Sequence, residues 1–188
     1  MPALPMQTDQ EGMNTGEFLT KLTIWVSILA YVTGAFIFAF SHRRQTWLRV
    51  ARLAWTIACA ALLAHVVCTF QVYHGWSHSA AFRDTARQTN EVVGLNWGGG
   101  IYFNYVVVVV WIIDVLWWWW SGPGSYRQRP RVLIAAWHAF LIFMIFNATV
   151  VFKTGITRWA GLVACICLVV AWAMYCRLPA CSDVRETS

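Results

Sequence analysis

The chain has 188 residues, of which 59% are hydrophobic and only 12% are charged, and its formal net charge is +6. About 25% of the residues of an ordinary soluble domain are charged, so this chain has too few to cover a water-facing surface. The composition therefore argues against a soluble globular protein. Nucleic acid is not an expected partner either, because the basic residues gather between apolar blocks, where membrane topology accounts for them.

Five apolar blocks reach or approach the roughly 17–25 residues that a helix needs to cross a bilayer. In chain order they are 18–40, 48–73, 101–120, 132–152 and 159–176. The sequence thus predicts an all-α membrane protein, a bundle of five transmembrane helices in one domain (18–177). A polar N-terminal tail (1–17) precedes this domain, and a short cytoplasmic tail (178–188) follows it.

The N-terminal tail is polar and acidic, without the basic and apolar segments of a cleavable signal peptide. The first block is therefore expected to remain as a membrane helix. Nine of the 14 Lys and Arg residues lie on the side of the first and third connections and five on the other side. The positive-inside rule then places the N-terminus outside and the C-terminus inside a cell membrane, which we expect to be a bacterial inner membrane.

The second block ends in a histidine-rich stretch that carries His65, His74 and His78. His74 and His78 are four residues apart, and on one helix they would face one side, as in many metal-binding pairs. His65 precedes His74 by nine residues, which is about 13.5 Å along a continuous helix with a turn of about 180°. All three can bind one metal ion only if the chain breaks and folds back, for which Gly75 is a candidate.

Two smaller hypotheses remain for the pair at the end of this stretch. His74 and His78 could bind a transition metal with a third ligand from the following connection, such as Asp84 or Glu91, or with Asn104. The alternative is a solvated pair of histidines at the membrane surface.

His65 has its own two interpretations. It could be an axial ligand of a haem, with His138 as the second ligand across the bundle. Their expected depths differ by about 9 Å, which opposes that arrangement. The alternative is a packed histidine that is hydrogen-bonded to a hydroxyl or carbonyl group of a facing helix.

The second connection (74–100) is long and predicted to lie outside. Its segment 80–93 has helical spacing, an Arg87–Glu91 pair four residues apart and Gly94 as a C-cap, so it predicts a short amphipathic surface helix. The glycine triplet 98–100 is expected to let the backbone pack closely where the third crossing begins. A connection of this length is either functional or a lid that closes the bundle.

Polar groups inside the third and fourth blocks are costly in a bilayer and so mark candidate sites. Asp114 and His138 fall at similar depth, and we expect them to touch. Such a pair would be a proton relay, a histidine ligand oriented by a carboxylate, or a structural hydrogen bond. Asn104 and Asn147 are the other intramembrane amides, and Asn147 is expected to bond a neighbouring helix.

Two aromatic clusters are expected to mark the membrane interfaces. Trp117–Trp120 would form the inner belt, and Trp76, Trp97 and Tyr102 the outer one. The connections that follow the third and fourth blocks are short, so the last three crossings are expected to pack side by side.

Three function classes are compatible with these residues. The first is a redox protein that holds a haem or a transition metal on its histidines. The second is a non-catalytic structural or assembly subunit that binds other membrane subunits. The third is a metal-dependent membrane enzyme, which lacks an evident third ligand. The lipid bilayer is the expected surrounding in each case, and the chain is not expected to be an enzyme on its own.

Overall fold

The computed structural model describes residues 15–41, 44–123 and 125–176, and this part of the chain is helical without any strand. Its five long helices are α1 (Thr15–Phe40), α2 (Gln45–Thr69), α4 (Gly100–Ser121), α5 (Arg131–Phe146) and α6 (Ile156–Cys176). A single π-helical turn extends α2 (η1, Phe70–His74), and another extends α5 (η3, Asn147–Val151). All five are long and apolar enough to cross a membrane. The predicted five-helix bundle is therefore confirmed.

The helix ends agree with the predicted blocks to within three residues, because apolar length sets the crossings. The first turn of α1 takes up residues 15–17, which the sequence pattern places in the tail. Residues 1–14 of that tail and the whole C-terminal tail lie outside the described residues. Three of the arginines counted for the orientation in the membrane also lie outside the described residues, namely Arg43, Arg177 and Arg185.

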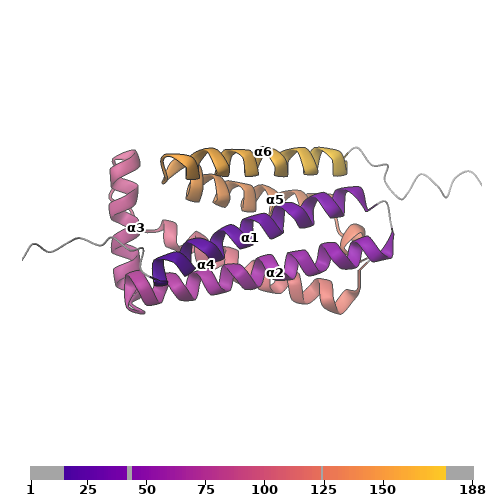
Figure 1. The fold of residues 1–188 in the computed structure, drawn as a ribbon, viewed down its shortest axis with the longest axis horizontal. Helices are drawn as coiled ribbons and strands as arrows, with labels where there is room; N and C mark the ends of the chain where they lie inside the picture. Colours follow the sequence, from indigo (N-terminus) through magenta and orange to yellow (C-terminus); the bar gives the residue numbers. More distant parts are fainter. Residues whose placement is uncertain (1–14, 42–43, 124, 177–188) are drawn as a thin grey trace, which may run out of the picture.

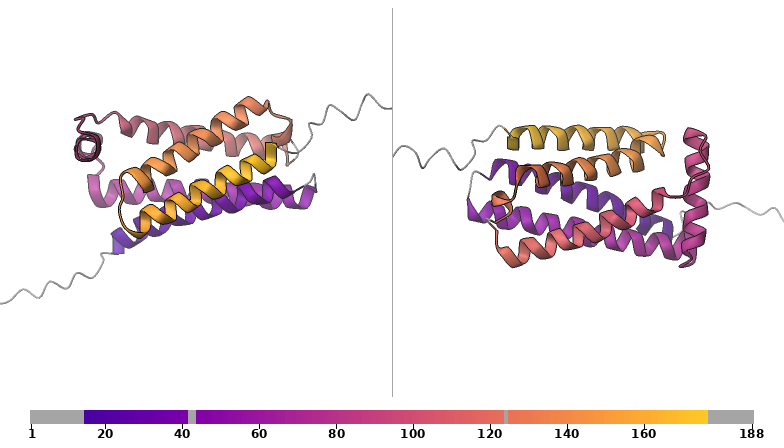
Figure 2. Two further views of the ribbon diagram at one scale, coloured as in Figure 1. Left: turned by 90° about the horizontal axis from the view of Figure 1, so that it is seen from above. Right: turned by 180° about the vertical axis from the view of Figure 1, so that it is seen from behind.

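The long helices run side by side, while α3 (His78–Val93) lies across one end of the bundle (Figures 1 and 2). We call this end the α3 end. At the opposite end, the η2 end, a 3-10 turn (η2, Ser125–Gln128) joins α4 to α5. The most extensive contact is between α1 and α2, where a Cβ on Gly34 would lie 3.3 Å from the Cβ of Ala54.

The last three crossings do not all pack side by side as predicted. Helix α5 does pack against α6, but α4 packs mainly against α2. Two large rings fill the space between α4 and α5, since Trp111 and Trp137 meet edge to face with centroids 6.3 Å apart. The distance between two helix axes grows with the size of the side chains at their contact, so these indoles hold the two backbones apart.

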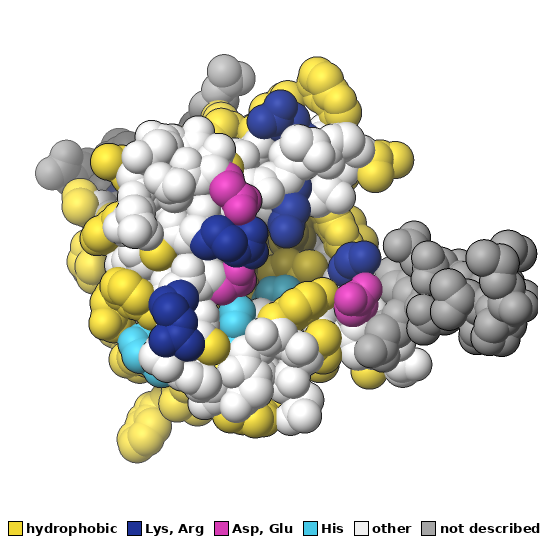
Figure 3. All heavy atoms as spheres, turned by 90° about the vertical axis from the view of Figure 1, so that its left-hand side faces the viewer, with side chains coloured by type: hydrophobic (Ala, Val, Ile, Leu, Met, Phe, Trp, Pro, Cys, Tyr) yellow, Lys and Arg dark blue, Asp and Glu magenta, His cyan; other side chains and the backbone are white. Residues whose placement is uncertain are grey.

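A tight reversal connects α2 to α3. Gly75 and Trp76 both have positive φ angles, of 52° and 60°. Ser77 then caps α3 by accepting a hydrogen bond from the backbone N–H of Ala80 at 3.3 Å. Gly94 ends α3 with a φ of 74°, as predicted. Charged side chains of both signs gather on this face of the molecule (Figure 3).

The predicted contacts of α3 are present in the structure. Arg87 bonds Glu91 at 2.8 Å and also Asp84 at 2.5 Å. The glycine triplet passes beneath α3, and a Cβ on Gly98 would lie only 2.5 Å from the backbone oxygen of Phe82. Close approach of two backbones is thus the reason for glycine here.

The contact between η3 and α6 has no room for an added methyl group. A Cβ on Gly161 would lie 1.9 Å from Oγ1 of Thr149. We expect Gly161→Ala to lower the free energy of unfolding by about 1–3 kcal/mol, the usual effect of overpacking. Thermal unfolding in mild detergent would measure the loss. Adding Thr149→Gly, which removes both the Oγ1 and the Cβ that the new methyl group would meet, should restore part of it. A single variant as stable as the parent would contradict this close contact.

Candidate functional site

The carboxylate of Asp114 is the centre of a buried polar network at the η2 end of the bundle. Asp114 lies on α4 and is 8% exposed. Nε1 of Trp55, from α2, donates a hydrogen bond to Oδ2 at 2.9 Å. Nη1 of Arg129 donates to Oδ1 and completes an ion pair. The hydroxyl group of Tyr126 is a third donor. A buried charge needs such donors, and here α2 and the η2 connection supply them.

Arg129 reaches this carboxylate from the loop between η2 and α5. Its side chain is 9% exposed, and its guanidinium carbon lies 4.2 Å from the ring centroid of Trp117 and 4.3 Å from that of Tyr126. Ring faces attract a cation most strongly when water is excluded. Nε and Nη2 are buried without a hydrogen-bond partner among the described residues. The ion pair and the two rings therefore hold this charge in the bundle.

Tyr31 and His138 form a second buried pair, between α1 and α5. The hydroxyl group of Tyr31 lies 2.8 Å from Nδ1 of His138, and the two rings are nearly parallel. Trp55 packs edge to face against the imidazole, with centroids 5.4 Å apart. Trp55 thus contacts both polar pairs.

The expected contact between Asp114 and His138 is replaced by separate partners for each residue. Asp114 bonds Trp55 and Arg129, whereas His138 bonds Tyr31. The position of a residue along its helix gives its depth alone. The sideways separation of α4 and α5 is imposed by the indoles between them, and it keeps the two side chains on separate partners.

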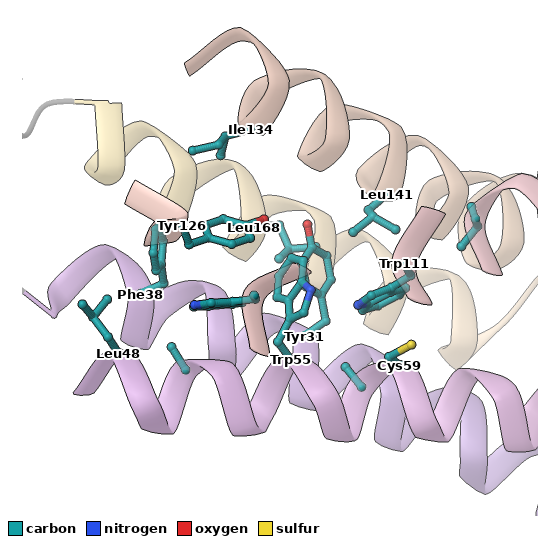
Figure 4. Packing of buried hydrophobic residues seen from close by; sticks show 14 residues of the cluster. Tyr31, Phe38, Leu48, Trp55, Cys59, Trp111, Tyr126, Ile134, Leu141 and Leu168 are labelled. Carbon is teal, nitrogen blue, oxygen red and sulfur yellow. The ribbon is translucent and has the colours of Figure 1, made fainter. Parts of the chain in front are cut away.

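A cluster of aromatic rings surrounds both pairs, and we call it the aromatic core. Neighbouring rings in it meet mostly edge to face or tilted, with centroids 4.3–6.2 Å apart. Each such contact contributes about 0.5–1.5 kcal/mol beyond the burial of its area. Figure 4 shows most of these rings converging from α1, α2, α4 and η2. The members are Tyr31, Phe38, Trp55, Trp111, Trp118 and Tyr126.

A cavity of about 20 Å³ lies between the aromatic core and α6. Tyr126, His138 and Tyr175 are among the residues that line it. A single water molecule needs about 10–15 Å³, so this space can take one water molecule and no organic cofactor.

The two proposed haem ligands have other partners. Nδ1 of His65 lies 2.9 Å from the backbone oxygen of Thr20 on α1, which is the arrangement of the alternative interpretation. His138 bonds Tyr31 and lines the small cavity. The structure therefore gives no support to a haem between His65 and His138.

His74 and His78 do not lie on one helix. His74 ends η1 and packs against the ring of Phe70, with centroids 5.6 Å apart, whereas His78 begins α3. Nδ1 of His78 lies 2.8 Å from the hydroxyl oxygen of Tyr105. The two histidines therefore do not share a helix face, because the left-handed backbone at Gly75, the candidate break, interrupts the helix.

The α3 end shows histidine side chains in and beside a hollow (Figure 3). Within the described residues, no three His, Cys, Asp or Glu side chains stand close enough together to hold a metal ion. The metal hypothesis thus has no complete ligand set in this part of the chain.

The two intramembrane amides differ in their surroundings. Nδ2 of Asn147 donates to the backbone oxygen of Phe143 in its own helix at 2.8 Å. The expected bond to a neighbouring helix is therefore replaced by a local one, at the start of the π turn. Asn104 lies exposed on α4, close to its beginning.

Comparisons with other proteins do not identify the chain. No protein-family model matches it, and no curated protein or solved structure is detectably similar to it.

Sequence reasoning missed Tyr31, Trp55, Tyr126 and Arg129. The signal for Arg129 was present, because a buried carboxylate needs a cationic or hydrogen-bonding partner and the basic connection begins soon after Asp114. The positive-inside rule alone places this arginine at the membrane surface. The aromatic partners carry no comparable signal, since most tryptophans in such a chain are belt or packing residues.

The ion pair gives a prediction about stability. We expect Asp114→Asn or Arg129→Gln alone to lower the free energy of unfolding by about 3–5 kcal/mol, because each leaves an uncompensated buried group. Thermal unfolding in detergent would measure both. The double variant should lose less than the sum of the single losses. Additive losses would contradict a direct interaction.

Proposed function

We propose that the chain is a non-catalytic subunit of a membrane assembly, a rigid helix bundle that binds other membrane proteins through its lipid-facing surface. One observation carries this proposal. Three of the polar groups that would be the candidates for chemistry are engaged in hydrogen bonds to another element of the bundle, namely His65, Asp114 and His138. Groups used in this way fix the packing of a bundle.

These bonds connect most parts of the bundle. Oγ of Ser27 donates to the backbone oxygen of Ala58 at 2.8 Å, and the His65 contact adds a second link between α1 and α2. The Tyr31–His138 pair joins α1 to α5. The bond from Trp55 to Asp114 joins α2 to α4. A bundle held at so many points favours a structural role over one that requires an open site.

Asn104 supports the binding of a partner. Large apolar side chains are exposed on all five long helices, as lipid or a partner helix requires. Asn104 is a polar exception on this surface. Amide side chains can hydrogen-bond across helices in membranes, and an amide in apolar surroundings is unfavourable without such a bond. We infer that a partner helix supplies it, in a cell membrane such as a bacterial inner membrane.

The competing function is the histidine-based redox protein that holds a haem or a transition metal. It would use His65 with His138, or His74 with His78. Each of these residues except His74 has a hydrogen-bond partner in the chain, and His74 packs on an aromatic ring. A metal-dependent enzyme would need the same ligands.

A purification from the native membrane tests this proposal. We expect the protein in mild detergent to lack a Soret band and stoichiometric metal, and to co-purify with defined partners. A photo-crosslinking side chain at position 104 should capture one partner in stoichiometric yield. The matched position is Asn90, which is exposed on α3 and should capture little.

Two results would overturn the assignment. The first is a haem spectrum or a stoichiometric metal that disappears in His65→Ala or His74→Ala, which would establish the redox function. The second is a protein that migrates alone and gives no specific crosslink at position 104.

A further inference from the structure

Arg52 is part of a closed unit where α2 and α4 are in contact. Its guanidinium carbon lies 3.9 Å from the ring centroid of Trp119. Nε1 of Trp119 donates to Oγ1 of Thr56 at 2.9 Å, and this hydroxyl group donates to the backbone oxygen of Arg52. The indole is therefore fixed by α2 itself, and it holds the guanidinium in one place. We call these three residues the Arg52 site.

The Arg52 site lies at the level of the tryptophan belt. Arg52 is about 10 Å from the beginning of α2, and Trp119 is about 3 Å from the end of α4. Trp117, Trp119 and Trp120 are exposed there, whereas Trp118 is buried in the core. Exposed tryptophans gather where lipid headgroups meet the hydrocarbon. The guanidinium is thus placed beside the headgroups.

The charge of Arg52 has no counter-ion among the described residues. The ion pairs in that part of the chain involve Arg87 and Arg129 instead. Nε of Arg52 is buried and has no hydrogen-bond partner in the part of the chain that the structure describes. A guanidinium at the edge of the hydrocarbon requires an anion, and its planar fork fits a phosphate through two parallel hydrogen bonds.

We propose that the Arg52 site binds the phosphate group of an anionic glycerophospholipid. Arg49 lies nearly one turn closer to the beginning of α2, and its side chain is exposed. Arg44 is exposed just before this helix. Their positive potential attracts a lipid with a net negative charge and disfavours the ammonium group of a zwitterionic one. The guanidinium is already held against the indole, so it loses little conformational freedom when it binds the phosphate. This raises the affinity of the site for the lipid.

Native mass spectrometry of the intact protein with added lipid tests the proposal. We expect the parent protein to retain phosphatidylglycerol in preference to phosphatidylcholine. Arg52→Gln should weaken retention of phosphatidylglycerol by about tenfold, the value of one lost charged hydrogen bond. Arg52→Lys keeps the charge but not the planar fork, so its retention of phosphatidylglycerol should fall between those of the parent and Arg52→Gln. The matched control is Arg83→Gln on α3, which should leave retention unchanged.

Other outcomes would overturn the proposal. Equal retention by the parent and Arg52→Gln, or an equal loss in Arg83→Gln, would show only general attraction between basic residues and lipid. Binding of inorganic phosphate with no preference for phosphatidylglycerol would assign the site to a soluble anion. If Arg52→Gln does not fold, Trp119→Phe replaces it, because this variant removes the bond to Thr56 and should also weaken retention.

Discussion

The carboxylate of Asp114 requires hydrogen-bond donors because it lies inside a bundle of apolar helices. Trp55 supplies one donor from α2, and the cation comes from the connection between α4 and α5. The η2 connection therefore folds back against the bundle and brings Arg129 to the carboxylate. This folding also places Tyr126 in the aromatic core, where it is 2% exposed. The buried carboxylate of Asp114 thus accounts for the packing of the η2 connection against this end of the bundle.

The number of crossings and their ends could be predicted, because apolar length is a property of the sequence itself. The interpretation of His65 as a packed histidine could be predicted as well, since a lone imidazole in a bundle needs a polar partner. The partners of Asp114 could not. They depend on which helices are neighbours and on the direction of a loop. The position of Asp114 and His138 along their helices predicts their depth in the membrane. The separation between α4 and α5 depends instead on the size of Trp111 and Trp137, which lie between them.

The two ends of the bundle are closed in different ways. At the η2 end an ion pair and closely packed aromatic rings fill the space between helices. At the α3 end a helix lies across the bundle, held by His78 on Tyr105 and by the close passage of Gly98 beneath Phe82. Histidine serves here as a hydrogen-bonding connector between elements. The residue type that first indicated a metal site is thus also suited to fastening a surface helix.

The length of α2 has a consequence for the surrounding bilayer. Together with its π turn this helix has 30 residues, about 45 Å, whereas the hydrocarbon layer is about 30 Å thick. The other crossings are shorter by four to nine residues. A helix that is longer than the hydrocarbon layer by this amount must tilt, extend into water or thicken the membrane around it. Because Arg52, about 10 Å into α2, is placed beside the headgroups, this helix takes up its excess length by extending into the water at the η2 end.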